Sequence, residues 1–217
     1  MRTYCLGWVL LLALIAMQGA AYDHPLGSHA IREAYFIGSE NRFAEVLSNY
    51  TKNLPAPKTG PHVAQIEVRT PFAQIIVSSH EHSVGYSSMS AERDYRKNPD
   101  TVQVRVQIVS TATYAIGSQG TVSEIIAPHS CQGVQRVNSV EDCFPDFRFG
   151  FQQEQQNIKP KSFYGVPKDR GDPSILIGAD IRFTFSKADI ASVPFRITVS
   201  TPDGQKVSAE FDLATLR

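Results

Sequence analysis

The sequence predicts a mainly β protein, an antiparallel β-sandwich with a helical extension at its N-terminal end. From residue 62 onward, apolar residues recur mostly at every second position, the period of a strand with one buried face. About seven or eight such segments follow one another with turn residues between them. Alternation, in place of continuous apolar runs, favours antiparallel pairing. A β-barrel fits the same pattern and is the alternative.

Composition allows one globular domain. The chain of 217 residues is 42% hydrophobic and 19% charged, which excludes an intrinsically disordered chain. Its 21 Lys and Arg balance 21 Asp and Glu, so the formal net charge is zero. Domains that bind nucleic acid normally present a basic face, and this balance argues against nucleic acid as a partner.

Residues 1–21 have the parts of a secretory signal peptide. Arg2 supplies a charged start, Trp8–Met17 is an apolar stretch, and small residues precede a cleavage point after Ala21. The apolar stretch is shorter than the roughly 20 residues that cross a bilayer, although an uncleaved anchor helix is the alternative. We therefore expect a secreted or periplasmic protein that begins near Tyr22 and has no transmembrane segment.

Residues 22–61 are expected to form a helical N-terminal extension followed by a proline-rich linker. Ile31, Ala34 and Tyr35 share one face at helical spacing, and apolar residues at 43–47 repeat this pattern. The following segment TKNLPAPKTGP holds three prolines, which favour an extended backbone. The predicted sandwich domain then covers residues 62–217.

The clearest strand of that domain is expected at residues 101–110, where apolar and polar residues alternate without a break. The last two strands are expected to form a hairpin whose turn contains Asp203 and Gly204. Further strands are expected at residues 64–68, 72–77, 121–127, 147–151, 181–185, 195–199 and 207–211, and a short helix at 90–97.

Cys131 and Cys143 remain after the expected cleavage, and in an oxidising compartment they are expected to form a disulfide. The bridge would close a polar surface loop and stabilise the fold by about 3 kcal/mol in the chain-entropy model. A redox or metal-binding pair is the alternative. The spacing is unlike CxxC, and the chain after cleavage has no third cysteine for a zinc site.

The motif His80-Glu81-His82 is the candidate metal site. On a strand, residues two apart point the same way, so His80 and His82 could bind one ion. A third ligand could come from His62, His129 or Glu81. The alternative is that both histidines are ordinary polar surface residues of a loop.

Catalytic signatures are sparse. The sequence has no GxSxG elbow, no GxGxxG and no P-loop, so no cofactor is expected. The neighbours His129 and Ser130 beside Cys131 point in different directions and do not suit a catalytic pair. A carboxylate pair for glycoside hydrolysis could come from Glu124, Glu141, Asp142, Asp146, Asp169, Asp172 and Asp180.

Two segments are candidates for binding a partner. Residues 152–173 lack periodicity and are expected to form a long polar loop, and such loops are usually functional. The second is the expected disulfide loop, 131–143. Other surface candidates are the sequon at Asn49 and the tripeptide Arg170-Gly171-Asp172. An aromatic set could line a ligand surface but fits a core strand better: Phe147, Phe149, Phe151, Phe163 and Tyr164.

These observations favour an exported, non-enzymatic binding or interaction module, immunoglobulin-like only in its general architecture, with a protein or envelope component as its partner. One alternative is an extracytoplasmic hydrolase or metal-dependent enzyme that uses His80 and His82 or a carboxylate pair. Another is a stress-protective or envelope-structural protein without a discrete ligand.

Overall fold

The computed structural model describes residues 25–40, 42–82, 85–98, 100–111, 113, 147–169 and 176–217. This part of the chain is mainly β, with two antiparallel sheets and a few helices, as the alternating sequence predicts. Its strands form no closed barrel, so the barrel alternative is wrong for the described residues. No helix in these ranges is long and apolar enough to cross a membrane.

The larger sheet has five strands in the order β1-β2-β3-β7-β6, and the smaller has four in the order β5-β4-β8-β9. All neighbouring strands are antiparallel. The strands are β1 (Thr51–Asn53), β2 (His62–Arg69), β3 (Thr101–Val109), β4 (Arg148–Gln153), β5 (Gln156–Asn157), β6 (Ser162–Asp169), β7 (Leu176–Ser186), β8 (Pro194–Ser200) and β9 (Lys206–Asp212).

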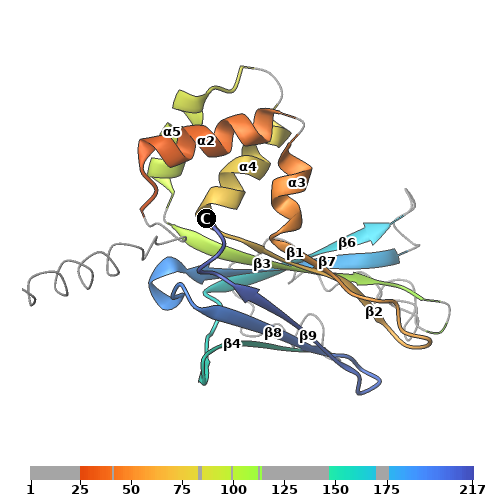
Figure 1. The fold of residues 1–217 in the computed structure, drawn as a ribbon. Coiled ribbons are helices and arrows are strands. Elements are labelled where there is room, and N and C mark those ends of the chain that lie inside the picture. Colours follow the sequence, from red (N-terminus) through yellow and green to blue (C-terminus); the bar gives the residue numbers. More distant parts are fainter. Residues whose placement is uncertain are drawn as a thin grey trace, which may run out of the picture.

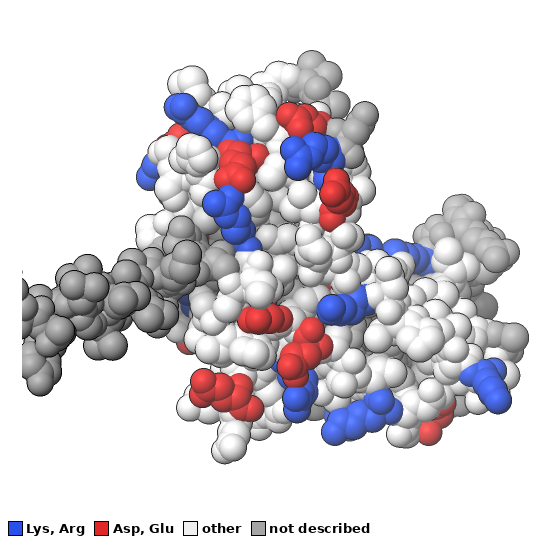
Figure 2. Space-filling view, viewed as in Figure 1, with Lys and Arg blue, Asp and Glu red and all other residues white. Residues whose placement is uncertain are grey.

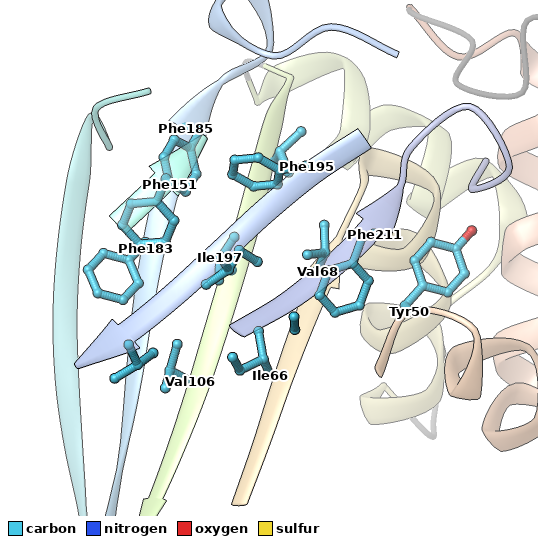
Figure 3. Packing of buried hydrophobic residues seen from close by; sticks show 14 of the residues in the cluster. Tyr50, Ile66, Val68, Val106, Phe151, Phe183, Phe185, Phe195, Ile197 and Phe211 are labelled. Carbon is cyan, nitrogen blue, oxygen red and sulfur yellow. The ribbon is translucent and has the colours of Figure 1, made fainter. Parts of the chain in front are cut away.

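The main core lies where side chains of the two sheets meet. Phe151 of β4 contacts Phe183 and Phe185 of β7, with ring centroids 4.8 and 4.9 Å apart. Figure 3 shows these rings pointing toward one another between the strands, with Tyr50 at the side of the cluster nearest the helices. The four apolar residues of β3 expected to face the core are at most 1% exposed, because the strand alternates as predicted: Val102, Val104, Val106 and Ile108.

Four helices form a layer on the opposite side of the five-stranded sheet from β4, β8 and β9 (Figure 1). Its own core includes Ile31, Phe72 and Ile76, which are buried against one another. The helices are α2 (Ser28–Ser39), α3 (Phe43–Ser48), α4 (Pro71–Glu81) and α5 (Ser88–Lys97), and a short 3-10 helix, η3 (Lys187–Asp189), precedes β8. The layer therefore takes helices from both sides of the predicted boundary at residues 61 and 62.

The expected strand at 72–77 is wrong, because these residues belong to helix α4. Thr70 caps the helix, and its side-chain oxygen accepts a hydrogen bond of 3.3 Å from the backbone N–H of Ala73. Pro71 occupies the first turn, where its fixed φ and missing N–H suit a helix start. The apolar run is buried as one helical face against α2, not as one side of a strand.

The expected loop at 152–173 is also wrong over its described part. Residues 152 and 153 end β4, residues 156 and 157 form β5, and residues 162–169 form β6. Strand β6 pairs with β7 along its length, with a register shift between Lys168 and Asp169. The backbone pairing with β7 overrides a local composition of proline, glycine and polar residues that disfavours strands.

The C-terminal segment, residues 213–217, joins β9 to the helical layer (Figure 1). Leu213 is fully buried in the main core. The backbone carbonyl of Arg217 accepts hydrogen bonds from the hydroxyl of Tyr50, at 3.2 Å, and from that of Thr70. The Arg217 guanidinium pairs with Glu33 of α2, so this segment connects the end of β9 with α2, with Tyr50 before β1 and with Thr70 before α4.

Candidate functional site

The two histidines of the candidate metal site do not lie on a strand. His80 is in the last turn of α4, and its ring stacks on Phe43 of α3 with centroids 3.6 Å apart. His82 caps the helix, donates from Nδ1 to the carbonyl of Ser78 at 2.6 Å, and stacks on Tyr86. The shared direction expected from a strand is therefore wrong, and each ring packs against a different aromatic residue.

The proposed third ligands do not complete a cluster in the described chain. His62 begins β2, with Nε2 3.3 Å from the carbonyl oxygen of Leu54, and Glu81 is exposed at the end of α4. Within the described ranges no group of three His, Cys, Asp or Glu side chains could hold a metal ion. The metal site stays a prediction without a supporting geometry.

Two of the candidate carboxylates lie in described strands, Asp169 in β6 and Asp180 in β7. The other candidate carboxylates and several further predicted sites lie outside the described residues. The expected features outside the described ranges are the signal peptide 1–21, the strand 121–127, His129, Ser130, the Cys131 and Cys143 disulfide, Glu124, Glu141, Asp142, Asp146, and the tripeptide 170–172.

The outer face of the five-stranded sheet carries a connected set of ion pairs, which we call the charged face. Arg105 of β3 lies between two carboxylates, 2.5 Å from Asp180 of β7 and 3.5 Å from Glu67 of β2. Glu67 also binds Arg69, at 2.7 Å, and Asp180 lies 3.1 Å from the Lys168 ammonium group of β6. Four strands thus contribute side chains to one network.

The carboxylates of this network are buried and bound by cations. Glu67 and Asp180 are each 5% exposed. Burial lowers the pKa of Arg105, but its hydrogen bond to Asp180 and the charges of Asp180 and Glu67 outweigh burial and raise that pKa above its ordinary value. Arg105 therefore stays charged and holds both carboxylates in place.

Arg182 is the cation of the charged face without a carboxylate partner among the described residues. It lies directly opposite Arg105 in the β3–β7 register, which places two like charges side by side. Its guanidinium donates to the hydroxyl of Tyr164 at 2.9 Å and lies 5.6 Å from the centre of the same ring. Its Nε is buried without a hydrogen-bond partner in the described chain.

Strand β6 borders this arginine and forms an edge of the sheet. Within the described residues β6 pairs only with β7, so its other edge is unpaired. Tyr164 and Val166 are 39% and 42% exposed there, and they lie on the same side of β6 as Lys168. Pro167 has no N–H to donate, which fits an edge strand.

The helical layer covers only one end of the charged face. Gln74 of α4 accepts a hydrogen bond from Gln103 of β3 at 3.1 Å and donates to the carbonyl of Thr101 at 2.7 Å. These contacts lie at the end of β3 nearest its start, while Tyr164 and Val166 remain exposed farther along the sheet. The open part of the charged face therefore combines exposed side chains with surplus positive charge.

A concave feature of the described chain lies where the helical layer meets β1 and the C-terminal segment. It is a hollow of about 730 Å³. Asn49, the sequon asparagine, is exposed on its rim at the end of α3.

Figure 2 shows the side of the molecule seen in Figure 1, where basic and acidic residues lie close together on both the helices and the strands.

No protein-family model matches the chain, and no curated protein matches it.

The sequence indicates only part of the charged face. Charged and polar residues alternate with buried ones on β2, β3 and β7, and the alternation at 101–110 predicts that Arg105 faces away from the core. Ion pairing between Arg105, Glu67 and Asp180 depends on which strands are neighbours and in which register. A single sequence does not fix either one, so Glu67, Arg182 and Lys168 were missed.

Proposed function

We propose that the protein is an exported, non-enzymatic interaction module whose two sheets form a β-sandwich. We further propose that it binds an acidic segment of a protein partner through the charged face beside β6. The observation that carries the proposal is Arg182, a cation that Tyr164 holds in place and that lacks a carboxylate partner among the described residues. A carboxylate of the partner would supply the missing charge.

Charge balance on the charged face supports an acidic partner. Its described side chains in register contain two carboxylates and four cations, namely Arg69, Arg105, Arg182 and Lys168. Both carboxylates already bind cations of the network. A surplus of two positive charges therefore remains on a protein whose overall net charge is zero.

The exposed side chains of β6 support a protein segment over a small ion. Tyr164 and Val166 offer apolar contact on the same face, and the unpaired edge of β6 offers backbone donors and acceptors to an extended chain. An acidic segment with alternating apolar and carboxylate side chains would use both features. This edge falls within residues 152–173, one of the segments favoured from the sequence.

The test uses a fluorescently labelled peptide of about ten residues in which Glu and Val alternate. We expect it to bind the purified protein, measured by fluorescence anisotropy. Arg182→Gln should weaken binding about tenfold, because a hydrogen bond between charged groups contributes about 1.5 kcal/mol. Raising the salt concentration should weaken binding by the native protein more than by the variant.

Lys206→Gln is the matched control, because Lys206 is an exposed cation at the start of β9, on the other sheet. This variant should bind the peptide like the native protein. A peptide in which Lys replaces Glu should not bind. Equal affinity of the native protein and Arg182→Gln, or equal binding of the two peptides, would overturn the proposal.

A further inference from the structure

We infer that the hollow between the helical layer, β1 and the C-terminal segment binds a small organic anion with an apolar portion. This site is separate from the charged face, because its walls come from α2, α3, the start of α4, β1 and residues 215–217. Its volume of about 730 Å³ is in the usual range for small-molecule sites. The site does not depend on the partner proposed for β6.

The side chains at the hollow carry a net positive charge. Three cationic side chains line it, Arg42 at the start of α3, Lys52 on β1 and Arg217, against one acidic side chain, Glu33. Glu33 is already paired with Arg217. No carboxylate of the described chain lies within ion-pair distance of Arg42 or Lys52. Two cations from different elements are thus available to one anionic group.

The wall beside these charges includes apolar side chains. Ile37 of α2 and Val46 of α3 line the hollow and are half-buried, and the buried residues Phe72 and Leu216 lie in the same wall. The Arg217 guanidinium lies 5.7 Å from the centre of the Phe72 ring, and hydrogen bonds from Tyr50 and Thr70 hold the Arg217 backbone. The apolar wall therefore stands beside the cations, which favours a ligand with both characters.

Two dyes that differ by one charged group test this inference. Anilinonaphthalene sulfonate carries an aromatic ring system and a sulfonate, whereas N-phenyl-1-naphthylamine has the same rings without the charge. We expect the sulfonate to bind the purified protein at one site and at least tenfold more tightly than the neutral dye. Fluorescence titration at low salt measures both affinities.

Variants locate the site. Arg42→Gln combined with Lys52→Gln should weaken binding of the sulfonate about tenfold and leave the neutral dye unaffected. Arg93→Gln combined with Lys97→Gln removes two exposed cations of α5 and should change neither affinity. Near-ultraviolet circular dichroism should be the same for every variant, so that binding to a loosened core is excluded.

Three results would overturn the inference. The first is that the sulfonate does not bind, and the second is that the charged and neutral dyes bind with equal affinity. The third is that the Arg42 and Lys52 double variant binds the sulfonate as tightly as the native protein. None of these results bears on Arg182, whose peptide test uses a different surface. The two proposals can therefore fail independently.

Discussion

At the scale of single residues, Gly60 shows how a turn specifies one amino acid. Its φ is +83°, a conformation that L side chains rarely adopt. A Cβ at this position would also meet the Asp203 carboxylate at 2.0 Å. Hydrogen bonds from Thr201 and Gln205 hold that carboxylate, and the Thr201 bond is the main cause that lowers the Asp203 pKa below its ordinary value of 3.8. Gly60 therefore lets the linker before β2 lie against the β8–β9 turn.

Gly60→Ala should lower the free energy of unfolding by about 2–4 kcal/mol, measured by urea unfolding. Gly204→Ala is the matched control, because Gly204 has nearly the same φ, +82°, but no atom lies within 4 Å of the place that an added methyl group would take. The control should lose only about 1 kcal/mol, the cost of the backbone conformation. Equal losses in the two variants would show that the contact with Asp203 has no energetic effect.

At the scale of elements, the alternating strands were predicted well, and the helix expected at 90–97 appears as α5, whereas helix α4 was not predicted. β3, β7, β8 and β9 appear where alternation places them, because one face of each is buried in the main core. Helix α4 was missed because an apolar run of this length fits a strand or a buried helix equally. The cap at Thr70 and Pro71 was the local signal that separates the two.

Strand β6 and the charged face could not be predicted from the sequence, for a different reason. Pro160, Gly165 and Pro167 disfavour a strand, and only pairing with β7 makes β6 one. The meeting of Arg182 with Tyr164 depends on the same pairing. Patterns within a segment thus identify which side of a strand is buried, whereas neighbours in a sheet are set by the packing of the whole chain.

The close packing of α2 on α4 predicts how a methyl group added at Gly38 changes the stability of the fold. A Cβ added at Gly38 would lie 2.3 Å from the backbone oxygen of Ile76 and 2.8 Å from Cβ of Ser79. Gly38→Ala should therefore lower the free energy of unfolding by about 1–3 kcal/mol, although alanine favours a helix over glycine by about 1 kcal/mol. Thermal and urea unfolding measure the change.

Gly150→Ala in β4 is the control for this prediction. The nearest atom to its added Cβ is Cβ of Thr198, at 3.7 Å, which is an ordinary contact. This variant should be neutral or slightly more stable, because alanine lowers the entropy of the unfolded chain. If Gly38→Ala were as stable as Gly150→Ala, the close approach of α2 and α4 would be wrong.

At the scale of the whole molecule, tyrosine hydroxyls connect segments that are far apart in the sequence. Tyr95 of α5 accepts a hydrogen bond of 2.9 Å from the backbone N–H of Leu26, and Tyr50 donates to the C-terminal segment. Burial is the largest cause that raises the pKa of Tyr50, Tyr86 and Tyr95, and for Tyr95 a hydrogen bond with Asp100 adds to it and brings the pKa to about 12. These hydroxyls stay protonated in the fold above the pH at which they ionise in the unfolded chain.

Stability should therefore fall as the pH rises through the window from 10 to about 12. Above pH 10 the unfolded chain loses the Tyr95 proton, whereas the folded chain retains it up to about 12, so alkali favours unfolding. Urea unfolding at a series of pH values measures the slope. Tyr95→Phe should flatten it. A slope unaffected by Tyr95→Phe would contradict this origin.

The contacts of residues 213–217 also bear on the order in which the chain folds. The hydrogen bond between Tyr50 and Arg217 joins residues 167 positions apart, and the pair of Arg217 with Glu33 joins residues 184 apart. Closing so long a loop costs conformational entropy before any contact offsets it, so such contacts form late. The contacts of the C-terminal segment with Tyr50 and α2 would then form only after β8 and β9 are paired. Such an order would suit the export proposed above, in which the chain crosses a membrane unfolded and completes its structure on the far side.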